Sequence, residues 1–361
     1  MQPVLFADDK QFWHETQRVL GHAAYGGADT GEVLATAQRI VPGDYDSWHD
    51  EWLATAERIA REAETAAKAG HRISGRDGLL RASNYYRCAE FFLHGLPDDP
   101  RIDYSHEQSV ACFAQAAALF SPPVEQVEIP FEPVALHGYF YRGSGHGLLP
   151  TVIMHNGFDG PAEEMHFFGA AAAAERGYNV LSFDGPGQPA ARHSNGLPFR
   201  PDWENVVTPV VDWVMTRPGV DQFRIALLGV SMGGYLAARA AAFEHRLAAC
   251  IAVDGIYDLG VITTSGFPGA RSEIEQMLRA DIDYSLAGGV AEKISCPSLI
   301  CEAEEDIFFR GQPEQVYDHL TCAKTLMRFS GAEGAGAHCR SGALRLAFGR
   351  IYDWLDDTLE V

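Results

Sequence analysis

The apolar positions of this chain follow two different periods, one before and one after about residue 120. In the first part they recur at the three- and four-residue spacing of amphipathic helices. Glycines and prolines at 42–43, 70, 75, 78 and 95–97 are expected to divide this part into five or six helices. The helical spacing is clearest at Trp48, Trp52, Ala56, Ile59, Ala60 and Ala63.

After Ser121-Pro122-Pro123 the pattern changes to short strands. Residues 124–129 and 136–141 alternate between apolar and polar side chains, which predicts an antiparallel pair. The later apolar runs do not alternate, as is typical of buried parallel strands. They lie at 151–154, 179–183, 225–228, 249–253, 298–301 and 326–329.

Helical segments separate these strands, which predicts an α/β fold with a doubly wound, mostly parallel sheet. We therefore expect an N-terminal helical cap or dimerisation region at 1–120 and a catalytic domain at 121–361. The stretch 260–290 is long and has glycines at both ends, so it is a candidate second lid. The helical segments lie at 162–176, 203–217, 233–243, 313–320 and 342–359.

Composition narrows the function classes. The 361 residues are 47% hydrophobic and 21% charged, which is typical of a globular protein. With 28 basic and 49 acidic residues the net charge is −21, which disfavours nucleic acid and anionic membranes as partners. The first nine residues lack the basic start and apolar stretch of a signal peptide, so a cytoplasmic location is expected. Seven scattered cysteines without a C-x-x-C pair indicate neither a disulfide framework nor a zinc ribbon.

The sequence Gly229-Val230-Ser231-Met232-Gly233 has the pattern of a nucleophile turn. It follows a predicted strand and opens a predicted helix, which is the context that a G-x-S-x-G turn needs. The turn is tight, so its flanking positions must be small, and the serine hydroxyl is held out at the edge of the sheet. Ser231 is therefore the predicted nucleophile.

A serine needs a base, and the base needs an acid to orient it. The strand at 298–301 runs into an acidic cluster, in which Asp306 is the predicted acid. Either Glu304 or Glu305 is the alternative, with Asp306 then only capping a helix.

The predicted base is His338, in a glycine-rich loop that follows the last strand. The order Ser231, Asp306, His338 is the one expected of α/β-hydrolases. Four other histidines are expected on exposed faces of the N-terminal helices: His14, His22, His49 and His71.

The negative oxygen of a tetrahedral intermediate needs two backbone N–H donors. Met232, directly after the nucleophile, is expected to supply one. The other is expected from the loop at 155–160, with the N–H of Phe158 favoured and that of Gly157 second. His155, at the start of this loop, is expected either to brace the loop or to contact substrate.

Cofactor motifs are weak in this chain. Residues 183–188 have glycines after a strand, but they lack the third glycine of a dinucleotide-binding fingerprint and contain Pro186. No histidines and carboxylates fall at metal-ligand spacing such as H-E-x-x-H. We expect a reaction without a cofactor or metal.

Residues 156–160, 183–188, 229–234 and 334–339 together resemble a group of capped α/β-hydrolases. The group contains 2,6-dihydroxypseudooxynicotine hydrolase, a fungal hydrolase that shortens a heptaketide pyrone, simple esterases and bacterial proteins of the FrsA type. The resemblance spans nearly the whole chain. It implies hydrolysis of an ester, or of a carbon–carbon bond next to a carbonyl, with the helical region closing over the site and often joining a homodimer.

Substrate contacts are less well marked. The predicted cap holds Tyr85, Tyr86 and Arg87, a set suited to an aromatic or polyketide-like ligand, although such a stripe often belongs to a core. The resemblance places one further pocket carboxylate in the segment after the strand at 249–253, and the uncharged residues 261–265 offer no equivalent. Tyr257, in the same segment, is a candidate substrate contact.

The sequence thus predicts a serine hydrolase that acts on a neutral carbonyl compound, because the acidic cluster beside Asp306 should repel anions. The expected partners are a small-molecule substrate and a second copy of the chain. The alternatives are a catalytically silent relative that acts as a small-molecule receptor, and a Rossmann oxidoreductase.

Overall fold

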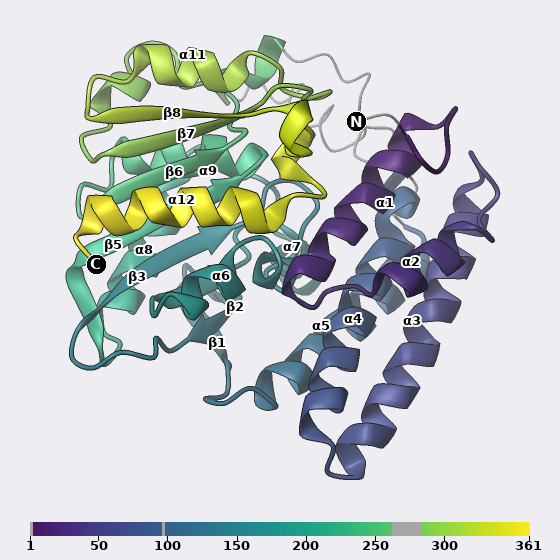
Figure 1. Ribbon diagram of the computed structural model, residues 1–361. Helices are drawn as coiled ribbons and strands as arrows, with labels where there is room; N and C mark the ends of the chain where they lie inside the picture. The colour runs from purple at the N-terminus through teal and green to yellow at the C-terminus, as the bar shows by residue number, and fades with distance from the viewer. Residues whose placement is uncertain (1–2, 96–97, 262–283) are drawn as a thin grey trace.

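The computed structural model describes residues 3–95, 98–261 and 284–361, and its N-terminal part is helical (Figure 1). Asp9, Asp44 and Asp99 each accept a backbone N–H at the start of a helix, which fixes where α1, α3 and α5 begin. The prediction of five or six helices is confirmed. They are α1 (Lys10–His22), α2 (Thr30–Ala37), α3 (Tyr45–Lys68), α4 (Arg72–Glu90) and α5 (Pro100–Ala118).

The expected breaks at Gly75 and Gly78 are wrong, because both glycines lie inside α4. A Cβ atom at Gly78 would stand 2.6 Å from the Cβ of Ala63, and one at Gly75 would stand 2.7 Å from the Cβ of Ala67. The two glycines therefore allow α3 and α4 to pack closely instead of ending a helix.

Eight strands form one sheet in the order β1-β2-β4-β3-β5-β6-β7-β8. β1 pairs antiparallel with β2, β2 pairs antiparallel with β4, and the other pairs are parallel, so the prediction of a mostly parallel sheet is confirmed. The strands are β1 (Glu125–Phe131), β2 (Val134–Tyr141), β3 (Leu149–His155), β4 (Asn179–Phe183), β5 (Val220–Val230), β6 (Ala249–Val253), β7 (Ser298–Ala303) and β8 (Lys324–Phe329).

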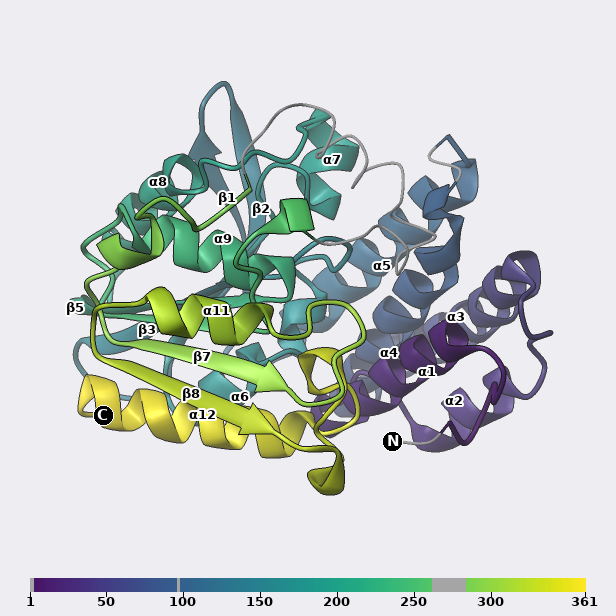
Figure 2. The same cartoon turned by 90° about the horizontal axis from the view of Figure 1, so that it is seen from above.

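Helices cover both faces of the sheet, as Figures 1 and 2 show. On one face lie α6 (Ala170–Glu175) and α12 (Leu344–Leu359), and on the other α8 (Glu204–Met215), α9 (Met232–Ala241) and α11 (Gln312–His319). Buried apolar side chains fill both layers.

Two helical segments differ from expectation. α6 is shorter than predicted, because Gly169 has φ of +118° and the helix can begin only after it. The short helix α7 (Pro189–Asn195) was not predicted.

The carboxyl ends of the parallel strands meet along one edge of the sheet, and the N-terminal helices lie beside this edge (Figures 1 and 2). Residues that follow β3, β5, β6 and β7 are therefore brought together near α1. Most of the candidate lid at 260–290 lies outside the described residues. Among the helices that the structure describes, none is both long and apolar enough to cross a bilayer.

Candidate active site

Ser231 lies on the turn between β5 and α9, with φ of +61° and ψ of −127°. This strained backbone needs close packing around it. A Cβ at Gly229 would stand 1.8 Å from the carbonyl oxygen of Gly233, and one at Gly233 would stand 2.6 Å from that of Asn156. Only glycine fits at both flanking positions, as the sequence pattern predicts for a nucleophile turn.

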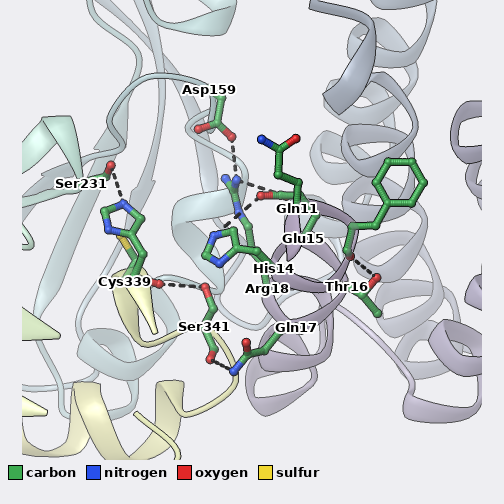
Figure 3. Close-up of polar contacts among 12 residues, drawn as sticks. Gln11, His14, Glu15, Thr16, Gln17, Arg18, Asp159, Ser231, Cys339 and Ser341 are labelled. Carbon is green, nitrogen blue, oxygen red and sulfur yellow. Dashed lines mark hydrogen bonds and ion pairs between the residues drawn. The ribbon is translucent and has the colours of Figure 1, made fainter. Parts of the chain in front are cut away.

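The three predicted catalytic side chains form one chain of hydrogen bonds. His338 Nε2 lies 2.9 Å from Ser231 Oγ, and His338 Nδ1 lies 2.7 Å from Asp306 Oδ2. In Figure 3 a dashed line marks the hydrogen bond of Ser231, and Cys339, the residue after His338, lies close by. His338 and Asp306 are each 6% exposed, so both groups are largely shielded from water. The arrangement has the geometry that a general base needs to take the serine proton.

Asp306 is the member of the acidic cluster that bonds His338 Nδ1. Its second oxygen, Oδ1, accepts the backbone N–H groups of Phe308 and Phe309 at 2.7 and 3.0 Å. Asp306 thus orients the imidazole and also caps the following turn. Glu304 and Glu305 are exposed, and Glu304 accepts the N–H of Gly331 instead.

The pKa of Asp306 is lowered and the pKa of His338 is raised. Burial would raise the pKa of Asp306, but the charge of His338 and the hydrogen bonds to Asp306 lower it to about 2. Burial would lower the pKa of His338, but Asp306 outweighs it and raises that pKa well above its usual value. Both shifts favour the charged forms of the two side chains, a carboxylate beside an imidazolium.

The predicted oxyanion loop approaches the nucleophile turn closely. A Cβ atom at Gly157 would stand 2.9 Å from the backbone nitrogen of Met232, so the two segments touch at this point. The N–H of Gly157 donates to Asn156 Oδ1 at 2.7 Å, which engages that donor. The N–H of Gly157 is therefore engaged within its own loop.

His155 is buried and braces this loop from within the protein. Its Nε2 accepts the indole N–H of Trp203 at 3.2 Å, and its Nδ1 lies 3.1 Å from the carbonyl oxygen of Asn156. Burial lowers the pKa of His155 to about 4. Both ring nitrogens are thus engaged by the protein itself.

Asp254, at the end of β6, is an acidic residue beside the site that sequence reasoning did not select. It has φ of +52° and is fully buried. Its Oδ2 accepts the N–H of Cys339 and an N–H of Arg340, both at 2.6 Å, and its Oδ1 accepts the N–H of Ala303 at 3.0 Å. Asp254 therefore holds the turn that carries His338.

Helix α1 brings a second histidine to the site. The ring of His14 lies 6.3 Å from that of His338 and 5.2 Å from that of Phe308, measured between centroids. Burial, with the nearby charges of His338 and Arg18, lowers the pKa of His14 to about 3, so its imidazole is neutral. The expectation that His14, His22 and His49 lie on exposed faces is wrong; of that group only His71 is exposed.

The predicted aromatic contacts in the cap lie inside the helical layer. Tyr85 is fully buried, donates to Glu32 at 2.8 Å and accepts the N–H of Asp29. Tyr86 is also buried. The structure does not bring either ring to Ser231.

Arg87 and Tyr257 each contact other side chains of the protein. Arg87 is buried, with Nε 3.3 Å from Glu164 and Nη1 3.6 Å from Glu15. Tyr257 stacks on His319, with 4.5 Å between ring centroids.

One group in the described part of the chain brings three potential metal ligands within 4.8 Å of one another: Asp254, His338 and Cys339. Asp306 already engages His338 Nδ1, and Arg340 already pairs with Asp254. Burial raises the pKa of the Cys339 thiol, which disfavours a thiolate ligand. These atoms serve the histidine turn and do not fit a cation.

The strand order, the Ser231 turn and the helices on both faces define an α/β-hydrolase, and the enzyme is a hydrolase. More narrowly, the chain belongs to the FrsA-like esterase family, whose model matches residues 12–265.

Among curated proteins, the hydrolase LUC6 from Fusarium sp is 35% identical over 407 aligned positions, which cover 97% of each chain. The 20-hydroxy-prefusarin hydrolase FUS2 from Gibberella moniliformis is 35% identical over 414 positions, covering 99% of this chain and 98% of that one. Among solved structures, 2,6-dihydroxy-pseudo-oxynicotine hydrolase superposes with a TM-score of 0.79 at 25% identity, covering 94% of this chain and 95% of that chain. The resemblance read from the motifs is confirmed.

Proposed function

We propose that this enzyme is a serine hydrolase that uses Ser231 as nucleophile, His338 as general base and Asp306 as the acid that orients the base. The proposal rests on the hydrogen bonds that run from Asp306 through His338 to Ser231. Ser231 itself lies on a strained strand-to-helix turn. The two hydrogen-bond distances, 2.7 and 2.9 Å, are those of competent proton transfer.

In the proposed reaction, Ser231 Oγ attacks a substrate carbonyl carbon while its proton passes to His338 Nε2. The N–H groups of Met232 and Phe158 stabilise the negative oxygen of the tetrahedral intermediate. The leaving group departs with its bonding electron pair and takes the proton from His338. A water molecule, deprotonated by the same histidine, then releases the acyl group as a carboxylic acid and restores Ser231.

The proposed substrate is a neutral, aromatic or polyketide-like carbonyl compound from secondary metabolism. Glu304 and Glu305 are exposed beside the acid, which disfavours anionic substrates. The similarity to fungal hydrolases such as FUS2 and to the pseudo-oxynicotine hydrolase supports a small organic metabolite over a protein or lipid substrate. Preferred turnover of a carboxylate or a coenzyme A ester would contradict this choice.

The bond that breaks is either an ester C–O bond or a C–C bond beside a ketone, and both fit the same intermediate. In the first case the leaving group is an alkoxide, and in the second an enolate. Aryl esters and 1,3-diketones incubated with the enzyme, with products identified by mass spectrometry, distinguish the two. Turnover of esters alone would reject C–C cleavage.

The test of the nucleophile is covalent labelling. An alkyl fluorophosphonate should add its phosphonyl group to Ser231, located by mass spectrometry of the peptide, and should not label the Ser231→Ala variant. Turnover should fall by several powers of ten in that variant with the fold intact. A wild-type chain that takes no label and turns over no substrate would instead be a binding protein.

The assignments of residues 1–120 as a cap, of the active form as a homodimer and of the location as cytoplasmic belong to the same proposal. The position of α1–α5 beside the carboxyl edge of the sheet supports the cap (Figure 2). Light scattering of the purified enzyme tests the dimer, and a monomer at assay concentration would reject it.

A further inference from the structure

Arg18, on α1, makes the main polar contact between the N-terminal helices and the oxyanion loop. Its Nε and Nη2 donate to the two carboxylate oxygens of Glu164, at 2.8 and 2.6 Å. Its Nη1 donates to Asp159 Oδ2 at 2.7 Å. Figure 3 shows the guanidinium of Arg18 reaching Asp159 from α1. Bidentate contacts of this kind fix orientation as well as distance.

Two of the three carboxylate partners of Arg18, Asp159 and Glu164, are tied to the loop that faces the nucleophile. Asp159 is the residue directly after Phe158, whose N–H is the proposed oxyanion donor. Glu164 accepts the side-chain N–H of Asn156 at 3.0 Å, and Asn156 in turn accepts the backbone N–H of Gly157. Arg18 thus holds the loop at both ends, at Asn156 through Glu164 and at Asp159 directly.

Arg87 shares the cluster but cannot replace Arg18 in this role. Its Nε and Nη1 are buried and make no hydrogen bond with any described residue, although they lie 3.3 Å from Glu164 and 3.6 Å from Glu15. Arg87 therefore supplies charge to the cluster, whereas Arg18 supplies the directed bonds.

The charge balance favours a structural action of Arg18 over a direct attraction to the reacting oxygen. The two arginines face three carboxyl groups, those of Glu15, Asp159 and Glu164. Burial would raise the pKa of Asp159, but Arg18 and then Arg87 lower it. Burial would lower the pKa of Arg18, but Asp159, Glu164 and Glu15 raise it well above its usual value. The positive charge of Arg18 is thus balanced by the negative charges of its carboxylate partners.

We infer that Arg18 is a positioning residue for the oxyanion hole, and that the N-terminal helices set the aim of the Phe158 N–H through the Arg18–Asp159 and Arg18–Glu164 contacts. This inference rests on the proposed function. It assigns to α1 a part in the chemical step beyond covering the site. Loss of Arg18 should leave the serine and histidine in place while the loop loses its fixed distance from Met232.

The experiment compares Arg18→Ala, Asp159→Asn and Arg345→Ala with the wild type. Arg345 is the control, because it also joins the two parts of the chain, through the carbonyl oxygen of Ala24, but lies on the surface and pairs with Glu175. Asp159→Asn keeps the shape of a side chain that is only 28% exposed, so it should fold even where Arg18→Ala does not.

For Arg18→Ala we expect kcat to fall about 100-fold, the loss typical of one oxyanion donor, with KM changed less than about threefold. For Asp159→Asn we expect a fall of about tenfold. Binding of a trifluoromethyl ketone, whose addition product places an oxyanion in this hole, should weaken in parallel with kcat/KM. Arg345→Ala should match the wild type in all three measurements.

Two results would overturn the inference: kcat at the wild-type level in a folded Arg18→Ala or Asp159→Asn variant, or a loss confined to KM with unchanged binding of the ketone. Either result, together with an inactive Ser231→Ala variant, would leave the proposed function standing. Activity in Ser231→Ala would instead reject the proposed function, whatever the Arg18 variants do.

Discussion

Asp254 and Arg340 form a 2.6 Å ion pair directly behind His338, and the two side chains are 0% and 1% exposed. The same carboxylate stands 3.8 Å from His338 Nδ1, whereas Asp306 stands 2.7 Å from it. Two carboxylates therefore adjoin one imidazole. Their other contacts separate their roles, because Asp254 is already bonded to two backbone N–H groups and to Arg340.

Replacement of Asp306 should affect catalysis far more than stability. Asp306→Asn removes the charge that selects the tautomer of His338 and stabilises its protonated form, so kcat should fall by about 10⁴. Steady-state kinetics and thermal unfolding of the same preparation measure both effects. A fall below tenfold would show that Asp254 can orient the histidine from 3.8 Å.

Replacement of Asp254 should affect stability first. Asp254→Asn leaves Arg340 buried without its charge partner, which should lower the free energy of unfolding by about 3–5 kcal/mol. The double variant Asp254→Asn, Arg340→Met removes both charges and should recover part of that loss. Denaturant unfolding of the two variants gives the comparison, and equal losses would show that the pair is not what stabilises this turn.

The activity should depend on pH through His338. Catalysis needs the neutral imidazole, and Asp306 raises the pKa of His338 well above the 6.5 of the free group. Activity should therefore be lost as the pH falls through a midpoint above 6.5, and Asp306→Asn should move that midpoint to lower pH. A neutral substrate at constant ionic strength keeps the profile free of substrate titration. A wild-type midpoint below 6.5 would contradict this reading.

The sheet and the proximity of Ser231, His338 and Asp306 could be predicted because their signals are local in the sequence. Short apolar runs mark buried parallel strands, and the segments that follow such strands must meet at one edge of the sheet. Ser231, Asp306 and His338 each lie in such a segment, so their proximity follows from the strand order. The glycines around Ser231 carry the same information, since they are needed within the turn itself.

The contacts that α1 makes with the site could not be predicted, because no local sequence pattern marks them. Arg18 contacts residues 141 and 146 positions away, and nothing near it in the sequence marks it as more than a polar residue of an amphipathic helix. His14 was expected to be exposed for the same reason. Tyr85 and Tyr86 were predicted as substrate contacts because their side chains are aromatic, yet they pack within the cap. Contacts between distant segments depend on how whole elements pack, which a periodic pattern does not specify.

His14 provides a test of contact with substrate. Its ring is neutral and packs beside Phe308 and His338, and its Nε2 lies 3.9 Å from Glu15 Oε1. If the imidazole bonds a polar group of the substrate, His14→Phe should lower kcat/KM about tenfold while the pH midpoint stays near that of the wild type. Unchanged kcat/KM would show that the ring only fills space.

The close approach of the oxyanion loop to the nucleophile turn makes Gly157 a sharp test of the loop's position. In Gly157→Ala the added Cβ would meet the Val230 carbonyl oxygen at 2.8 Å and the Met232 nitrogen at 2.9 Å, and both are backbone atoms that cannot rotate away. The loop must shift, so kcat should fall at least 100-fold. Gly349→Ala is the matched control, because Gly349 lies in α12 and an added Cβ would have no heavy atom within 4 Å apart from the backbone of its own helix. That variant should keep full activity and gain about 0.5–1 kcal/mol in stability. Wild-type kcat in Gly157→Ala would mean that the loop can move without loss of oxyanion stabilisation, and that the second donor lies elsewhere.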